Sequence, residues 1–123
     1  MRSLEIRRIL ETCLNQGGLE VWLLAGRAPL LRFPDCVREV QTGRPLSTED
    51  VTNLLLDGAT KLRAFWETHD FARFDYKCGW HDARFRVFLV RHGESAMATL
   101  TPISADTPEL EYTDDDPRRA IAG

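Results

Sequence analysis

The stretch from Ala83 to Arg91 most limits what this chain can fold into. Its sequence, ARFRVFLVR, alternates charged and apolar residues in the way that an extended strand requires, because side chains on a strand point to opposite faces at every second residue. We therefore predict a central β-strand. Its two faces carry Arg84, Arg86, Phe88 and Val90 on one side, and Phe85, Val87, Leu89 and Arg91 on the other.

The arginines of this strand are the first candidate contact residues. A strand that is buried on both faces excludes charged side chains unless something anionic meets them. One interpretation is a solvated face on which the arginine stems cover apolar surface, which is common for arginine. The other is a surface that contacts an anion or a partner, with Arg84, Arg86 and, more loosely, Arg91 as the contact charges.

Length and charge restrict the class of protein. A chain of 123 residues fits one domain with a modest core, and its net charge of -3 gives no reason to expect nucleic acid or an anionic membrane as a partner. No apolar run has the length of a bilayer-spanning helix, and residues 1–5 begin a charged amphipathic segment instead of a signal peptide. We expect a cytoplasmic protein without direct membrane insertion.

The cysteines and histidines do not form a recognisable metal site. Three scattered cysteines make a disulfide framework improbable, and neither a CxxC nor an HxxxH spacing is present. We therefore expect no metal and no cofactor. The residues weighed for such a site are Cys36, Cys78, His69, His81 and His92.

The remaining periodicities predict an α+β domain over residues 1–103. A helix begins near Ser3 and ends at Gly17, and three short strands follow over residues 19–24, 30–33 and 37–40. Ser47 caps a second helical stretch, which Gly58 interrupts before another helical stripe up to His69. Strands over residues 73–78, 83–91 and 95–103 complete an antiparallel sheet of five to six strands with about three helices. Residues 104–123 form an acidic tail that we expect to be disordered.

Several short segments, in this order, resemble the N-terminal domain of pilus retraction ATPases of the PilT type and, more distantly, that of type II secretion ATPases. The AGRAP of residues 25–29 looks like the family's AGxPP, and the PLSTED of residues 45–50 resembles its LTPED helix start. The FDY of residues 74–76 is similar to its F-S-Y/F strand. The ARFRV of residues 83–87 matches its ARFRVN motif up to the asparagine, which is Phe88 here.

The resemblance implies a PAS-like domain that precedes a RecA-like ATPase domain within a hexameric ring. It also implies that Arg84 and Arg86, and less directly Arg91, face nucleotide bound by the ATPase domain. We accordingly expect a non-catalytic protein-binding or regulatory module whose partner is a pilus- or secretion-type ATPase, with a homo-oligomer as an open possibility. The resemblance is to the accessory domain alone, because the chain contains no G-x-x-x-x-G-K-[ST] loop. We favour a stand-alone relative over a fragment.

The family's pattern is broken in two further places. Its Ser-Asp-Leu-His on the first strand appears here as the LEVW of residues 19–22, and its last-strand arginine aligns with Thr101. The function of that polar motif and the role of that arginine are therefore not carried over.

Two other functions are weighed against this one. The sequence Arg91-His92-Gly93 looks like the signature of histidine phosphatases, but that chemistry needs a second histidine and no histidine follows His92. A PAS-like fold can also act as a small-ligand or nucleotide sensor. We expect Trp80, in a predicted hairpin turn, to offer an exposed aromatic contact. The residues that would line a sensor pocket are Phe85, Val87, Leu89 and Met97.

Overall fold

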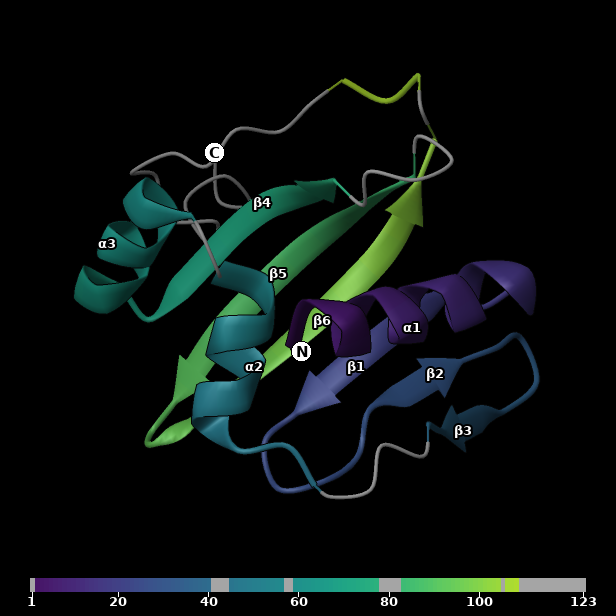
Figure 1. Cartoon of the computed structure of the whole chain (residues 1–123), viewed down its shortest axis with the longest axis horizontal. Helices are drawn as coiled ribbons and strands as arrows, with labels where there is room; N and C mark the ends of the chain where they lie inside the picture. Colours follow the sequence, from purple (N-terminus) through teal and green to yellow (C-terminus); the bar gives the residue numbers. More distant parts are fainter. Residues whose placement is uncertain (1, 41–44, 57–58, 78–82, 105, 109–123) are drawn as a thin grey trace.

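The computed structural model describes residues 2–40, 45–56, 59–77, 83–104 and 106–108, with side chains from Ile6 onward. Its main feature is a six-stranded sheet in which every pair of neighbours is antiparallel (Figure 1). The strands lie in the order β3-β2-β1-β6-β5-β4, so that the last strand of the chain occupies the middle of the sheet. Their bounds are β1 Glu20–Leu24, β2 Leu30–Arg32, β3 Val37–Glu39, β4 Phe71–Lys77, β5 Arg84–His92 and β6 Ser95–Ile103.

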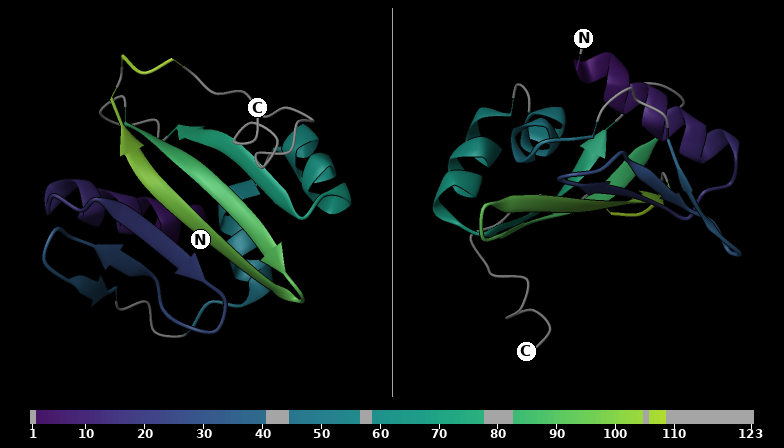
Figure 2. Two further views of the ribbon diagram at one scale, coloured as in Figure 1. Left: turned by 180° about the vertical axis from the view of Figure 1, so that it is seen from behind. Right: turned by 90° about the horizontal axis from the view of Figure 1, so that it is seen from below.

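Three helices cover one face of this sheet, and no helix of the described residues lies on the other face (Figure 2). They are α1 Arg2–Asn15, α2 Thr48–Leu56 and α3 Thr60–Thr68. None of them has the length and apolar character that crossing a bilayer would require in the part of the chain that the structure describes. The predicted α+β class, with six antiparallel strands and three helices, is confirmed.

The core lies between the helices and the covered face of the sheet. The alternation predicted for the central strand is confirmed, because Phe85, Val87 and Leu89 are fully buried while Arg84 and Arg86 lie on the opposite face. From α1, Ile6, Ile9 and Leu10 pack onto the same core at helical spacing. The uncovered side of the sheet, called here the open face, is lined by the residues of β5 that alternate with the core positions.

The start of α2 is fixed by reciprocal hydrogen bonds between Ser47 and Asp50. The backbone N–H of Asp50 donates to Ser47 Oγ at 3.0 Å, and the backbone N–H of Ser47 donates to the Asp50 carboxylate at 2.9 Å. This arrangement is a capping box in which aspartate takes the position more often held by glutamate. The Ser47 cap predicted from the sequence is therefore present, and it begins α2 near the turn between β5 and β6, where the Thr48 hydroxyl donates to the carbonyl oxygen of Glu94.

Two details of the sequence prediction need correction. β4 begins at Phe71, two residues before the predicted start, because Phe71 and Ala72 pair with Val90 and Leu89. Met97 does not share a face with Phe85, Val87 and Leu89: it lies on the open face with 46% of its surface exposed, whereas those three form the core. The four residues predicted to line a sensor pocket therefore do not lie on one face of the sheet. The predicted turn with Trp80 and His81 lies outside the described residues.

Candidate functional site

The candidate site is a pair of arginines on the open face, held by one buried carboxylate. Arg84 and Arg86 are two residues apart on β5 and therefore point to the same side of the sheet. Asp75 on β4 is directly opposite Arg86 in the strand register. A carboxylate in this position lies within reach of both guanidinium groups, since cross-strand and diagonal neighbours approach closely on one face.

The contacts within this triad are close and shielded from water. Arg86 Nε donates to Asp75 Oδ1 at 2.9 Å and one of its terminal nitrogens donates to Oδ2 at 3.3 Å, while Arg84 approaches Oδ2 at 3.4 Å. The Asp75 side chain is only 1% exposed, against 12% for Arg84 and 27% for Arg86. The hydrogen bonds that Arg86 donates to the Asp75 carboxylate raise the pKa of Arg86 above its ordinary value. The two guanidinium groups thus contact the same carboxylate.

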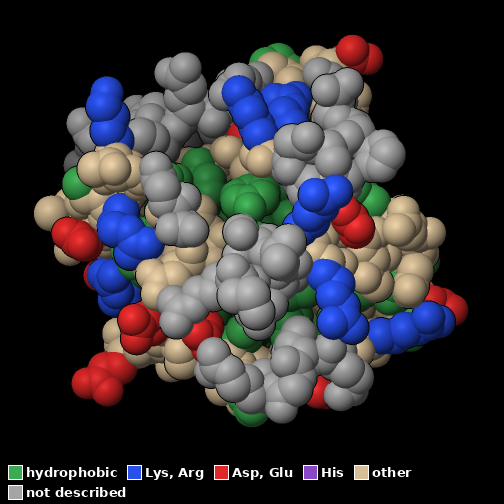
Figure 3. Space-filling model, viewed as in Figure 1, with side chains coloured by type: hydrophobic (Ala, Val, Ile, Leu, Met, Phe, Trp, Pro, Cys, Tyr) green, Lys and Arg blue, Asp and Glu red, His purple; other side chains and the backbone are tan. Residues whose placement is uncertain are grey.

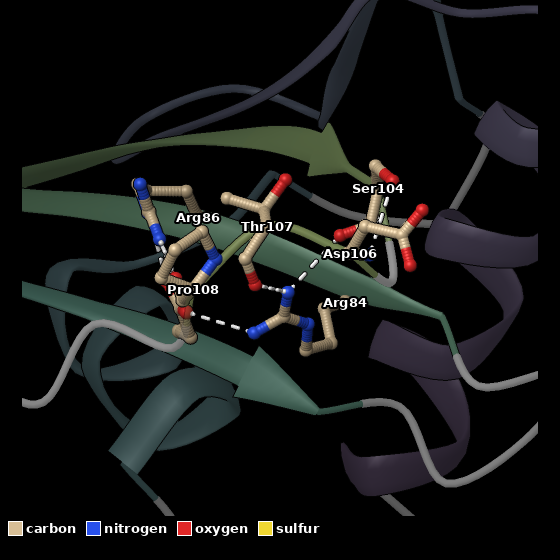
Figure 4. Close-up of polar contacts among 7 residues, drawn as sticks. Arg84, Arg86, Ser104, Asp106, Thr107 and Pro108 are labelled. Atoms are coloured by element: carbon tan, nitrogen blue, oxygen red, sulfur yellow. Dashed lines mark hydrogen bonds and ion pairs between the residues drawn. The ribbon is translucent and has the colours of Figure 1, made fainter.

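The arginine pair also holds the chain that follows β6. We call Ser104, Asp106, Thr107 and Pro108 the exit segment. One terminal nitrogen of Arg84 donates to the backbone carbonyl oxygens of Ser104, at 3.0 Å, and Thr107. A terminal nitrogen of Arg86 donates to the carbonyl oxygen of Pro108 at 3.1 Å. Figure 4 shows both guanidinium groups directed at this segment. The remaining residues of the predicted tail, 109–123, lie outside the described residues.

Arg91, the third predicted contact arginine, lies elsewhere. Its guanidinium stacks on Trp66 of α3, with 4.2 Å between the guanidinium carbon and the ring centroid. It also donates to the backbone carbonyl of His69 at 3.2 Å and lies 3.6 Å from the exposed carboxylate of Asp70. Arg91 therefore fastens α3 to the helix-covered side of β5, and the structure brings together only Arg84 and Arg86.

Beside the arginine pair the open face carries apolar side chains, together with the exposed Arg73 of β4 opposite Phe88. Phe88 follows Arg86 on the same face of β5 with 37% of its surface exposed, and Met97 lies on the adjoining strand. Trp22 and Leu24 of β1 continue this surface and are half-buried. From the helix-covered side, by contrast, Lys and Arg side chains lie at several separate places around hydrophobic side chains near the centre (Figure 3). The open face thus combines one arginine pair with an adjoining apolar area.

The histidines that can be placed form no reactive centre. His92 is exposed at the end of β5, while the neighbouring Arg91 points to the other face and stacks on Trp66. His69 stacks on Phe65, with 3.9 Å between ring centroids, at the end of α3. Within the described ranges, no group of three His, Cys, Asp or Glu residues could hold a metal ion. The arrangement around His92 is therefore unlike the site that its Arg-His-Gly sequence predicts.

Sequence reasoning missed two parts of this site. Asp75 alternates with Phe74 and Tyr76 in the sequence, a pattern that predicts a solvated position, and that prediction is wrong because its carboxylate is buried between two guanidinium groups. The alternation of β4 placed Asp75 on a wet face, but only the register with β5 shows that arginines meet it there. The contact with the exit segment was also missed, since it uses backbone carbonyl groups and leaves no signal in the side chains.

Comparison with known proteins identifies the fold. No family model and no curated protein matches the chain. Among solved structures, the pilus retraction motor PilT with bound ADP matches with a TM-score of 0.67 and 23% identity, over 85% of this chain and 30% of that one. The ATPase DotB of Legionella pneumophila matches with a TM-score of 0.63 and 17% identity, over 83% of this chain and 29% of that one.

These matches confirm at the level of the fold the resemblance that the sequence motifs predict. The chain spans less than a third of the length of either ATPase, as expected for a chain that corresponds to one domain of such a protein. The six-stranded sheet with its open face is therefore the fold of a domain that occurs in the pilus retraction motor PilT and in the ATPase DotB.

Proposed function

We propose that this chain is a non-catalytic protein-binding domain that acts with a pilus- or secretion-type ATPase in the cytoplasm, as the N-terminal domain does in that family. The observation that carries the proposal is the arginine pair on the open face of a sheet whose fold is shared with PilT and DotB. The open face is the surface that the partner contacts, and Arg84 and Arg86 are the contact charges.

The geometry of the pair suits a partner that presents phosphate or carboxylate oxygens. A guanidinium offers planar, fixed N–H donors that match such oxygens and remains charged at every physiological pH. Asp75 orients both groups, so that little side-chain entropy is lost when a partner binds. The exposed side chains of Phe88 and Met97 supply the apolar area that a protein interface needs beside its charges.

The proposal assigns no catalytic step to this chain. Its sequence lacks the phosphate-binding loop of P-loop ATPases, so the nucleotide chemistry belongs to the partner. The small-ligand sensor receives no support from the core, because Phe85, Val87 and Leu89 are fully buried against the helices. The histidine-phosphatase alternative lacks the second histidine and the nearby arginine that it requires.

The test is a binding titration of the labelled 123-residue chain into a PilT-type ATPase, with and without ATP. We expect saturable binding that depends on nucleotide and weakens about tenfold or more in Arg84→Gln/Arg86→Gln, since charged interface contacts are often worth more than 1.4 kcal/mol. Circular dichroism of each variant checks that it is folded.

The matched control is Arg32→Gln. Arg32 also lies on a strand of this sheet and also pairs with a cross-strand carboxylate, that of Glu20 at 2.6 Å, but it is far from β5 in the strand order. This variant should bind like the native chain. Equal loss in both variants would mean that general charge, and not the arginine pair, drives binding, and absence of binding at high micromolar concentration would reject this class of partner.

A further inference from the structure

The N–H donors that a phosphate-bearing partner would use are already occupied by the chain itself. The terminal nitrogens of Arg84 and Arg86 donate to three backbone carbonyl oxygens of the exit segment, those of Ser104, Thr107 and Pro108. The donors that face Asp75 hold the two guanidinium groups in place. An anion can take these particular N–H groups, one nitrogen of each arginine, only when the carbonyl groups of the exit segment leave.

The exit segment is shaped to present its carbonyl groups to the arginines. The N–H of Thr107 donates to the carbonyl of Ser104 at 3.0 Å, which closes a turn, and the N–H of Asp106 donates to Ser104 Oγ at 3.1 Å. This turn brings the carbonyl oxygens of Ser104 and Thr107 to the same nitrogen of Arg84. Arg84 thus holds both ends of this turn.

Among the residues that the structure describes, little apart from these hydrogen bonds holds the exit segment in place. Ser104, Asp106 and Pro108 are exposed, and Thr107 is half-buried, so that few apolar contacts would be lost if the segment moved away. A carbonyl oxygen is a neutral acceptor, whereas a phosphate oxygen forms a charge-assisted bond that is shorter and about twice as strong. The triad of two arginines and one aspartate keeps an excess positive charge, which favours the anion further.

We propose that the exit segment is a strap that a phosphate group displaces from Arg84 and Arg86. In the free chain the strap occupies the arginine pair, and a phosphate group takes the same donors and releases it. Binding of phosphate and docking of the strap are thus mutually exclusive, and each lowers the apparent affinity of the other. This inference rests on the contact role of the arginine pair proposed above. It adds that binding at the pair determines whether the segment that follows β6 stays docked on the sheet.

The test is a nuclear magnetic resonance titration of the whole 123-residue chain with tripolyphosphate at constant ionic strength. We expect the Nε–H signals of Arg84 and Arg86 and the amide signals of Asp106 and Thr107 to move with one common midpoint. Hydrogen exchange of the Thr107 amide should accelerate at saturation, since its turn bond opens with the strap. The Nε–H signal of Arg32 is the internal control and should not move. A parallel titration with ATP distinguishes recognition of the phosphates alone from recognition of a nucleotide.

A loosened strap provides the second arm. Thr107→Gly/Pro108→Gly keeps every backbone carbonyl and every charge but gives the undocked segment more conformational freedom. We expect tripolyphosphate to bind this variant roughly fivefold more tightly, from the entropy of two such substitutions. Pro34→Gly, in the exposed turn between β2 and β3, is the matched control and should leave the affinity unchanged.

The outcomes separate this inference from the proposed function. Movement of the arginine signals without the Asp106 and Thr107 signals would overturn the strap and leave the arginine site intact. No movement of either set at millimolar tripolyphosphate would overturn the inference as well, while binding to the ATPase would still decide the proposed function separately. Equal affinity in the native chain and Thr107→Gly/Pro108→Gly would also refute displacement.

Discussion

Replacing Asp75 by asparagine tests how strongly the arginine pair depends on its buried carboxylate. The substitution keeps the size of the side chain but removes its charge and turns one oxygen acceptor into an N–H donor. That donor then faces guanidinium N–H groups, which cannot accept it. Asp75→Asn therefore leaves Arg84 and Arg86 without their shared counter-charge, at positions where water reaches them only in part.

The expected cost follows from the burial of the three side chains. Removing one partner of a fully buried ion pair costs about 3–5 kcal/mol of unfolding free energy. Here the carboxylate is 1% exposed, but Arg86 is 27% exposed and Arg84 keeps its bonds to the exit segment, so that both can recover part of the loss. We expect Asp75→Asn to lower the free energy of unfolding by about 2–3 kcal/mol, after that discount.

The sheet contains its own matched control. Glu20 and Arg32 form a cross-strand pair between β1 and β2 with a shorter distance, 2.6 Å, but with 25% and 39% of their side chains exposed. Glu20→Gln should cost about 0.5–1 kcal/mol, as exposed ion pairs do. Comparing the two variants therefore separates the effect of burial from the effect of distance.

The assay is urea unfolding followed by tryptophan fluorescence, with both variants measured at the same pH and salt concentration. A difference in the unfolding midpoint at unchanged slope reports stability alone. If Asp75→Asn costs no more than Glu20→Gln, burial does not determine the strength of this contact. The description of Arg84 and Arg86 as a preorganised pair would then be refuted.

Three further predictions concern the rest of the domain. Burial raises the pKa of the Cys13 thiol from 9.0 to about 11. The free energy of unfolding is therefore unaffected by this thiol below pH 9 and falls by roughly 2–3 kcal/mol as the pH rises to 11. Urea unfolding across this pH range should show the loss, and in Cys13→Ala the part of the loss that comes from the thiol should be absent. Ser47→Ala should cost about 1 kcal/mol in thermal unfolding through loss of the α2 cap, whereas Thr52→Ala in the same helix should cost less. Phe85→Ala should cost about 3–5 kcal/mol and Phe88→Ala below about 1 kcal/mol, and equal costs in chemical unfolding would contradict the two faces assigned to β5.

The elements with strict periodicity could be predicted from the sequence alone. The alternation of residues 84–92 is complete, and β6 spans the predicted residues 95–103, because Gly93 at φ 63° makes the turn that separates the two strands. The same alternation already placed Arg91 on the face opposite Arg84 and Arg86. What grouped Arg91 with them was their shared residue type, and residue type does not determine which face of a strand a side chain occupies.

The sequence predictions were wrong where side-chain size or strand register decides whether a residue is buried. Met97 looks more like a core residue than the alanines beside it, but Ala96 and Ala98 are the buried ones because α2 lies close over β6 and leaves room for small side chains. Asp75 could not be recognised as buried without the register of β4 against β5. A single sequence predicts which residues of a strand share a face. It does not predict which residue of the neighbouring strand lies opposite each of them.

The central place of β6 also bears on how the chain folds. The hairpins β1–β2 and β5–β6 join neighbouring segments, but Val21 of β1 pairs with Leu100 of β6, from nearly opposite ends of the domain. Closing so long a loop costs entropy before its contacts are gained, and pairings of this kind slow folding. During synthesis, the inner edge of β1 must stay unpaired until residues 97–100 have left the ribosome. The sheet can therefore be completed only after β6 has emerged, and the joining of β1 to β6 is the step that should limit its rate.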